Sequence, residues 1–392
     1  MTFRKWHSEM QITSLGCAVV VFGALAFIMI APCPVHAQTY AVLHSFGNGE
    51  DGLEPFGSLL LDAAGNLYGT TTAGGQEFWG TVFKMNSAGE ETILHAFSGS
   101  PDGAQAEGSL VSDGHGTLYG TTFKGGIYDY GTVYRLTKGG KETVYSFAGP
   151  GGDGAFPIGG LVADADGNLY GTTYQGGAAN DGVVFKISAT TGKEAILHNF
   201  TGGSDGMWPQ AGLVLDNAGN LYGTTIYGGT DNIGTVFKVT RTGKETIVHS
   251  FTDQPDGSQP DAALLFAGGK LYGTTYYGGT YGHGTVFSVD AMGKESVVYS
   301  FLGGSEGGWP WASLITDNAG NLYGTTSSGF SGNGTVFKID RFGNETVLYA
   351  FTGGDDGGDP QAALVRDSAG NLYGTTFGGG AYSAGVVFRL TP

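Results

Sequence analysis

Apolar and polar residues alternate along short stretches of the chain, and glycine-rich segments separate these stretches. In the first complete unit the alternation runs through residues 58–62, 66–71, 80–85 and 91–97. Successive side chains of a β-strand point to opposite faces of its sheet, so this pattern predicts half-buried strands. None of the four stretches has the periodicity of an amphipathic helix. We therefore expect four short strands in each unit.

The four stretches return seven times along the chain. The second stretch contains the sequence Leu-Tyr-Gly-Thr-Thr, whose copies begin at Leu67, Leu118, Leu169, Leu221, Leu271, Leu322 and Leu372. A separation of about 51 residues between copies is typical of a repeat architecture. Two tight hairpins per unit give a four-stranded antiparallel sheet, which is the blade of a β-propeller.

The two ends of the repeat region are complementary. Residues 40–46 match the fourth stretch of the other units, whereas residues 385–390 are a third stretch with no fourth stretch after them. If the N-terminal strand completes the last sheet, the ring closes and no sheet edge is left unpaired. We therefore predict an all-β fold, a seven-bladed β-propeller with four antiparallel strands per blade, and prefer it to an open solenoid or β-helix.

The first 37 residues do not follow the repeat. Arg4 and Lys5 precede an uncharged apolar run over residues 15–31, and Val35-His36-Ala37 fits the small-residue rule for signal peptidase. This pattern predicts a secretory signal peptide over residues 1–37 and a propeller domain over residues 38–392. An uncleaved membrane anchor is the alternative.

Composition narrows the classes of function. Both cysteines, Cys17 and Cys33, lie in the predicted signal peptide, so the mature chain has no thiol for disulfides, metal binding or nucleophilic chemistry. The net charge of −17 indicates a surface that repels nucleic acid and anionic lipid. We expect a secreted monomer, extracellular or periplasmic, with no nucleic-acid partner and no membrane insertion after signal cleavage.

The combined repeat pattern resembles a known family. Asp-x-Ala-Gly-Asn-Leu-Tyr-Gly-Thr-Thr, Gly-Gly, Gly-Thr-Val-Phe, Gly-Lys-Glu-Thr and Ser-Phe are similar to the GloVer tandem repeat of bacterial exported proteins. The resemblance covers all seven copies, and it implies an extracellular or cell-surface propeller without an established biochemical activity. Many members of this family carry a C-terminal anchoring segment. Because Thr391-Pro392 directly follows a strand here, we expect release rather than anchoring.

An acidic residue precedes glycine in the loop that leads into each unit. These residues are Asp51, Asp102, Asp153, Asp205, Asp256, Glu306 and Asp356. Because Ca²⁺ prefers carboxylate and carbonyl oxygens, the ring of acids makes calcium the one candidate cofactor. The alternative, which we favour, is a turn in which the acid accepts hydrogen bonds while glycine adopts positive φ. No loop has the dense alternating ligands of a dedicated calcium site.

Residues on either side of a loop proline position differ from unit to unit, as expected of a ligand surface. They are predicted to border the mouth of the central channel, and many are aromatic or amide side chains that suit a sugar or a peptide. The candidate binding residues are Phe56, Phe156, Trp208, Gln210, Trp309 and Trp311, together with Trp79 from another loop. Packing of these aromatic rings over the blades is the alternative.

Four carboxylates at the same positions allow a catalytic hypothesis. Glu54 and Asp359 fall on neighbouring blades across the closure, whereas Glu107 and Asp261 fall on distant blades. The first pair is therefore the better candidate for acid and base in a glycan-active hydrolase or lyase. We favour a non-catalytic module that binds carbohydrate or protein, or serves as a scaffold, at the cell envelope.

Histidine occurs at one position of the fourth stretch, in His44, His95, His198 and His249. Tyrosine occupies the same position in the other units. A position that accepts tyrosine is typical of side-chain packing, so we do not expect a metal ligand there.

Overall fold

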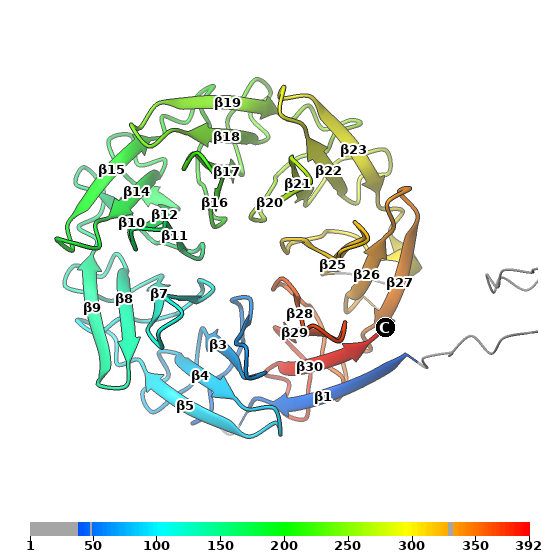
Figure 1. The fold of residues 1–392 in the computed structure, drawn as a ribbon, viewed down its shortest axis with the longest axis horizontal. Helices are drawn as coiled ribbons and strands as arrows, with labels where there is room; N and C mark the ends of the chain where they lie inside the picture. The colour runs from blue at the N-terminus through cyan, green and yellow to red at the C-terminus, as the bar shows by residue number, and fades with distance from the viewer. Residues whose placement is uncertain (1–37, 48, 328–331) are drawn as a thin grey trace, which may run out of the picture. The chain divides into compact units, whose positions relative to one another are not determined.

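A computed structural model of the chain describes residues 38–47, 49–327 and 332–392. The predicted signal peptide, residues 1–37, lies outside the described residues and stays a prediction. Thr39–Pro392 forms one compact unit. In this unit seven small sheets surround a central axis, and the chain passes once around the ring (Figure 1).

Each sheet has four antiparallel strands. The innermost strands are β2 (Leu60–Leu61), β6 (Val111–Ser112), β11 (Val162–Ala163), β16 (Val214–Leu215), β20 (Leu265–Ala267), β24 (Ile315–Thr316) and β28 (Val365–Arg366). The second strands are β3 (Leu67–Thr71), β7 (Leu118–Thr122), β12 (Leu169–Thr173), β17 (Leu221–Thr225), β21 (Lys270–Thr275), β25 (Leu322–Thr326) and β29 (Leu372–Thr376).

The third strands are β4 (Thr81–Met85), β8 (Thr132–Thr137), β14 (Val183–Ile187), β18 (Thr235–Val239), β22 (Thr285–Val289), β26 (Thr335–Ile339) and β30 (Val386–Thr391). The outermost strands are β5 (Glu91–Ala96), β9 (Gly140–Ser146), β15 (Glu194–Asn199), β19 (Glu245–Ser250), β23 (Glu295–Ser300), β27 (Glu345–Ala350) and β1 (Thr39–Ser45). A short extra pair, β10 (Gly154–Ala155) with β13 (Gln175–Gly176), and one 3₁₀ turn, η1 (Gly304–Glu306), lie outside these sheets. We number the blades 1 to 7 in chain order, so that β2 to β5 form blade 1.

The ring closes through the two ends of the repeat region. Strand β1 pairs with β30 in an antiparallel register that places Val42 opposite Phe388 and His44 opposite Val387. The seventh sheet therefore has the order β1-β30-β29-β28, in which the outermost strand comes from the N-terminal side. The predicted all-β fold, a seven-bladed propeller closed by its N-terminal strand, is confirmed.

The Leu-Tyr-Gly-Thr-Thr repeat has a separate structural reason at most of its positions. In blade 1, Leu67 is buried in the core, and a Cβ on Gly69 would lie 2.5 Å from the ring of Phe83. Thr70 donates a hydrogen bond of 3.3 Å to the carbonyl of Gly108 in blade 2, and Thr71 shares one of 2.9 Å with Thr81. The sequence recurs because each blade has to fit the same neighbours.

Aromatic side chains such as Phe83 and Phe97 pack between neighbouring blades. Both are buried, and Phe97 meets Tyr134 of blade 2 edge to face, with their ring centres 5.3 Å apart. Such pairs contribute about 0.5 to 1.5 kcal/mol beyond the area that they bury. Tyr68 is only half-buried, because its hydroxyl reaches out to Asp62 in a hairpin turn.

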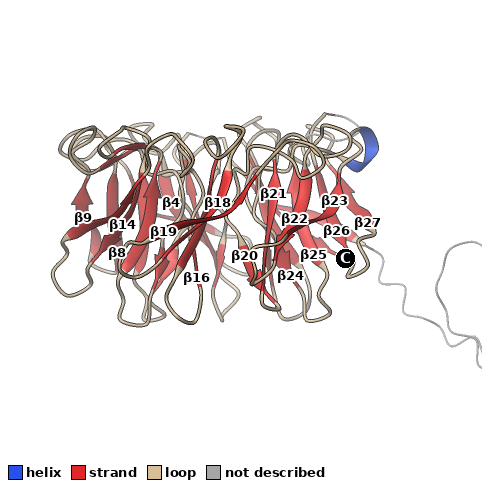
Figure 2. Cartoon of the chain, turned by 90° about the horizontal axis from the view of Figure 1, so that it is seen from above, coloured by secondary structure: helices blue, strands red, loops and turns tan. Residues whose placement is uncertain are grey.

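Two classes of loops share one face of the ring, which we call the loop face. The loop between β1 and β2 pairs with the loop between β3 and β4, since Leu53 and Ala73 exchange backbone hydrogen bonds. Equivalent bridges join Met207 to Tyr227 and Ser258 to Tyr277. The turn η1 also lies on this crowded face, and hairpin turns protrude on the opposite one (Figure 2). No helix in the described part of the chain is long and apolar enough to cross a membrane.

Candidate functional site

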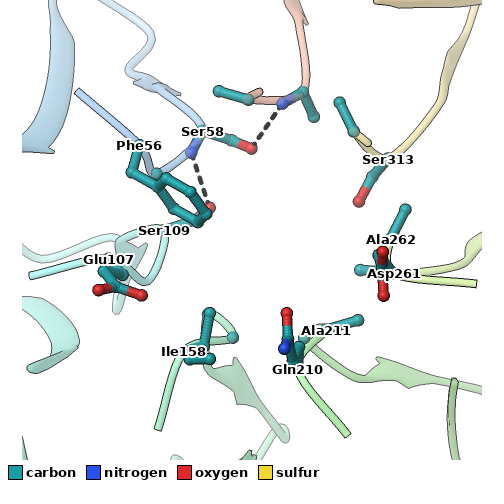
Figure 3. Close-up of a pocket in the computed structure, with 18 of the residues that line it drawn as sticks. Phe56, Ser58, Glu107, Ser109, Ile158, Gln210, Ala211, Asp261, Ala262 and Ser313 are labelled. Atoms are coloured by element: carbon teal, nitrogen blue, oxygen red, sulfur yellow. Dashed lines mark hydrogen bonds between the residues drawn. The ribbon is translucent and has the colours of Figure 1, made fainter. Parts of the chain in front are cut away.

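A cavity of about 220 Å³ lies where the innermost strands of the blades converge. Its wall carries the small residues that lie just before these strands, and three of them, Ser58, Ser109 and Ala363, are hydrogen bonded around the axis. The backbone N–H of Ser58 donates to Ser109 Oγ over 2.9 Å, and Ser58 Oγ accepts from the N–H of Ala363 over 3.0 Å (Figure 3). Small side chains are therefore needed here, because seven backbones meet around one axis.

The residues that follow the loop proline position line this cavity in all seven blades. They are Phe56, Glu107, Ile158, Gln210, Asp261, Trp311 and Gln361. The ring thus combines two aromatic residues, two amides and two carboxyl groups around one opening. Of the predicted binding residues, Phe56, Gln210 and Trp311 lie on the cavity wall. Trp311 is half-buried and packs its ring against Tyr276, with the ring centres 5.1 Å apart.

The residues that precede the proline position do not line the cavity. All seven adopt a left-handed backbone with φ between 54° and 59°, which costs a non-glycine residue about 1 to 2 kcal/mol. Hydrogen bonds to two blades hold them there: the N–H of Glu54 donates to Ala384 of blade 7, and its carbonyl accepts from Thr72 of blade 1. In this conformation the side chains of these seven residues lie away from the cavity at the axis.

Three predicted binding residues belong to this second group, and each packs against aromatic neighbours on the loop face. The Phe156 ring lies 5.0 Å from that of Phe123, the Trp208 ring 5.3 Å from that of Tyr174, and the Trp309 ring 5.0 Å from that of His283. All three remain half-exposed. Packing and ligand contact are therefore both available to these side chains.

Trp79 lies away from the cavity, in the loop between β3 and β4, and is 42 % exposed. Other exposed aromatic residues of the same loop class are Phe78, Tyr128, Tyr277, Tyr281 and Tyr382. Phe78 and Tyr382 were missed in the sequence analysis, and only their place in the same loop of blades 1 and 7 could have pointed to them.

Glu107 and Asp261 are the two carboxyl groups on the cavity wall, where they lie on opposite sides of the opening (Figure 3). Burial raises the pKa of Asp261 to about 7, and its Oδ1 atom is buried without a hydrogen-bond partner. Burial also raises the pKa of Glu107 to about 7, although the nearby Lys124 acts in the opposite direction. Both groups can exchange protons near neutral pH.

The other carboxyl pair, which the sequence analysis preferred, does not line the cavity. Glu54 Oε2 accepts a hydrogen bond of 3.3 Å from the hydroxyl of Thr72. Asp359 Oδ2 accepts one of 2.8 Å from Gln361, and burial raises the pKa of Asp359. The structure thus brings Glu107 and Asp261, rather than Glu54 and Asp359, to a common cavity.

The acidic loop residues proposed as calcium ligands lie near the outer rim of the ring, not at the cavity. Each accepts a hydrogen bond from the histidine or tyrosine of the preceding outermost strand, or lies close to it. The pairs are His44 with Asp51, His95 with Asp102, Tyr145 with Asp153, His198 with Asp205, His249 with Asp256, Tyr299 with Glu306 and Tyr349 with Asp356. In several loops the acid also accepts a backbone N–H, as Asp153 does from Ala148 over 2.7 Å. These contacts favour the turn interpretation, and the partners seven or eight residues upstream were not foreseen.

The fold and the cavity together define a closed seven-bladed propeller with a small, partly acidic and aromatic mouth. The family model described as "Gloeobacter/Verrucomicrobia repeat" matches residues 30–160, 79–268 and 234–392. The chain belongs to this repeat family, which confirms the resemblance seen in the sequence. No curated protein matches the chain.

Solved structures share the fold at low sequence identity. Virginiamycin B lyase from Staphylococcus aureus has a TM-score of 0.60 and 13 % identity over 91 % of this chain and 99 % of its own. The extracellular domain of a protein described as a hybrid two component system from B. thetaiotaomicron has a TM-score of 0.61 and 11 % identity, over 89 % and 39 %. A protein described as a 6-phosphogluconolactonase from Bacteroides uniformis has a TM-score of 0.51 and 15 % identity, over 75 % and 83 %. At these identities the likeness concerns the fold alone.

Proposed function

We propose that this chain is an exported, non-catalytic propeller that binds a carbohydrate or a protein segment at the mouth of its central cavity. The observation that carries the proposal is the ring of residues after the proline position. Phe56 and Trp311 offer aromatic faces for stacking, while Gln210 and Gln361 offer amide donors and acceptors. Sites for small ligands usually combine apolar surface with a few polar groups in this way.

The size of the cavity limits what can enter it. Sites that enclose a drug-sized ligand measure about 300 to 1,000 Å³, and this cavity is smaller, at about 220 Å³. We therefore expect one sugar ring, or one side chain of a protein ligand, to enter the cavity while the rest lies on the loop face. The half-exposed rings of Phe156, Trp208 and Trp309 would extend the contact there.

The binding proposal is tested with the chain starting at Gln38, which is screened against glycans and peptides. The affinity for the best ligand is then measured by calorimetry. We expect Trp311→Ala to weaken binding at least tenfold, because its ring is on the cavity wall. Phe342→Ala is the control, since that ring is 75 % exposed in the hairpin turn between β26 and β27 on the opposite face, and it should change affinity less than threefold. Unchanged binding by Trp311→Ala would refute the proposal.

A glycan-active hydrolase or lyase is the second candidate, because Glu107 and Asp261 share the cavity and both have a pKa near 7. One group could then donate a proton while the other accepts one. Turnover of soluble polysaccharides, followed by new reducing ends and by absorbance of unsaturated products, tests this function. If it is correct, Glu107→Gln and Asp261→Asn should each lower kcat at least a hundredfold. If no polysaccharide is turned over, the binding function is favoured.

Export is proposed on the leader pattern of residues 1–37 and the acidic composition. The similarity to an extracellular domain in a solved structure is compatible with it. Expression of the full chain with a C-terminal tag, followed by cell fractionation, should recover the protein outside the cytoplasm. N-terminal sequencing should then begin at Gln38. Recovery in the membrane fraction with the leader intact would instead support the anchor.

A further inference from the structure

Three side chains meet at each junction between neighbouring blades near the outer rim. The first is the histidine or tyrosine of one outermost strand, and the second is the acidic residue of the loop that follows this strand. The third lies in the next blade, six positions before the phenylalanine that directly follows its outermost strand. This third residue is Glu91, Lys141, Glu194, Glu245, Glu295, Glu345 or, in blade 7, Tyr40. The seven junctions therefore share a geometry but differ in chemistry.

Three junctions combine one imidazole with two carboxylates, and two of them bring one ligand atom from each side chain within 4.8 Å of the others. At the remaining one, His198 Nε2 lies 3.4 Å from Asp205 Oδ2, but the atoms of His198, Asp205 and Glu245 do not form such a cluster. His44, Asp51 and Glu91 lie between blades 7 and 1, and one ligand atom from each lies within 4.8 Å of the others. The Nε2 atom of His44 is 3.1 Å from Asp51 Oδ2 and 3.9 Å from Glu91 Oε2. Metal bonds of 2.0 to 2.2 Å in a tetrahedron place ligand atoms roughly 3.4 Å apart, so the spacing suits one ion.

The second such junction lies between blades 4 and 5. His249, Asp256 and Glu295 again place three ligand atoms within 4.8 Å of one another. Nε2 of His249 is 2.8 Å from Asp256 Oδ2. The side chain of Asp256 is only 8 % exposed, so this junction is shielded from water to the same degree as the first.

Both glutamates have an oxygen atom that lacks a partner. Oε1 of Glu91 and Oε1 of Glu295 are buried and make no hydrogen bond. An ionised carboxylate in this position is costly unless a cation or a donor compensates it.

The junction between blades 1 and 2 shows what fills this space when the glutamate is absent. His95 and Asp102 are present, but Lys141 replaces the glutamate. Its Nζ atom lies 2.8 Å from Asp102 Oδ1, and its side chain is only 3 % exposed. Although burial opposes the effect, hydrogen bonds from His95 and Lys141 lower the pKa of Asp102 to about 2. At this junction the chain supplies the cation itself.

We propose that the His44, Asp51 and Glu91 cluster and the His249, Asp256 and Glu295 cluster are binding sites for a divalent metal ion of the zinc class. An imidazole with two carboxylates favours zinc over calcium, which prefers six to eight oxygen ligands. Each ion would link an outermost strand to the next blade. The first site would fasten β1, the strand that closes the ring. His44 and His249, two of the four histidines interpreted as packing residues from the sequence, would then be metal ligands.

Calorimetric titration of the EDTA-treated chain from Gln38 with ZnCl₂ at pH 7.5 tests the proposal. We expect two ions per chain. Glu91→Lys and Glu295→Lys, which copy the Lys141 junction, should each reduce the number to one, and the double variant should bind none. Because the lysine supplies the missing charge, the metal-free variants should melt within a few degrees of the parent chain.

The reverse substitution gives a gain of binding. Lys141→Glu completes a third cluster with His95 and Asp102, so it should raise the number of bound ions to three. His115→Ala, in an exposed hairpin turn, is the control and should leave the number at two. The proposal is overturned if zinc does not bind, or if neither lysine substitution changes the stoichiometry. Equal binding of CaCl₂ would overturn the assigned metal class.

Discussion

At the scale of single residues, the repeat is governed by how closely neighbouring atoms approach one another. Gly69 has an ordinary backbone conformation, so glycine recurs at this position of the repeat because a side chain would clash, and not because of its backbone angles. A methyl group there would lie 2.5 Å from Phe83 Cζ and 3.0 Å from Leu59 Cδ2. The same phenylalanine ring packs against Phe46 of blade 7, with the ring centres 5.3 Å apart. One methyl group would therefore disturb two blades.

We expect Gly69→Ala to lower the free energy of unfolding by about 1 to 3 kcal/mol, since the Phe83 ring has to leave its position. Urea denaturation followed by tryptophan fluorescence measures this loss. Gly203→Ala is the control, because Gly203 is exposed and the nearest atom to its new methyl group would be 3.9 Å away. Equal stability of the two variants would contradict the steric explanation of the repeat.

At the scale of elements, the pairing of β1 with β30 is the contact on which ring closure depends. It joins residues more than 340 positions apart, and Ala41 lies opposite Arg389 in its register. Tyr40 of this pair also stacks on Tyr349 of blade 6, with the ring centres 4.0 Å apart. The strand thus joins blade 7 to its neighbour as well as completing its own sheet.

A disulfide across this pair should stabilise the protein. The described residues contain no cysteine, so Ala41→Cys with Arg389→Cys gives a single defined bond. We expect the oxidised variant to gain about 3 to 5 kcal/mol, because the bond constrains a very long loop in the unfolded chain. Thermal unfolding with and without reductant measures the gain, and the Ala41→Ser, Arg389→Ser variant controls for the substitutions. A gain that persists in reductant would have another cause.

At the scale of the whole molecule, buried acids set the dependence of stability on pH. Burial first, and then a neighbouring acid, raises the pKa of Glu194, Glu245 and Glu345 to about 7 each. The folded chain therefore binds more protons than the unfolded chain between pH 4.5 and 7. Its stability falls as the pH rises through this window.

The hairpin-turn aspartates act in the opposite sense at lower pH. Burial opposes the effect, but hydrogen bonds from Asn66 and Tyr68 lower the pKa of Asp62. Asp164, Asp216, Asp317 and Asp367 have the same kind of shift. These groups stabilise the fold above the unfolded pKa of 3.8, and their contribution is lost as the pH falls through their lower folded values.

We therefore expect maximal stability near pH 4 to 5, with a decline toward pH 8. The variant with Glu194→Gln, Glu245→Gln and Glu345→Gln should show a smaller decline, because these side chains no longer ionise. Urea denaturation in EDTA at pH 5 and pH 8 compares the two proteins. A decline of the same size in both would show that other groups cause it.

The fold could be predicted from the sequence because every blade repeats the same local requirements. The same contacts recur in every blade. They determine the alternation of apolar and polar residues, the positions of the glycines and the small residues at the axis. The site was only partly predictable. The residues before and after the proline position were expected at one mouth, but the left-handed backbone at positions such as Trp208 separates the two rings. The cluster of His44, Asp51 and Glu91 forms only where two blades pack side by side. The spacing of these residues in the sequence therefore could not predict it.

The pairing of the first strand with the last also has a consequence for biogenesis. A chain that crosses a membrane from its N-terminus delivers β1 before any other strand, yet the partner of β1 is delivered last. During this interval Tyr40 and Val42 belong to an unpaired segment that can join the sheet edge of another copy. If the chain is exported as proposed, factors that shield its leading segment until translocation is complete would therefore favour correct closure of the ring.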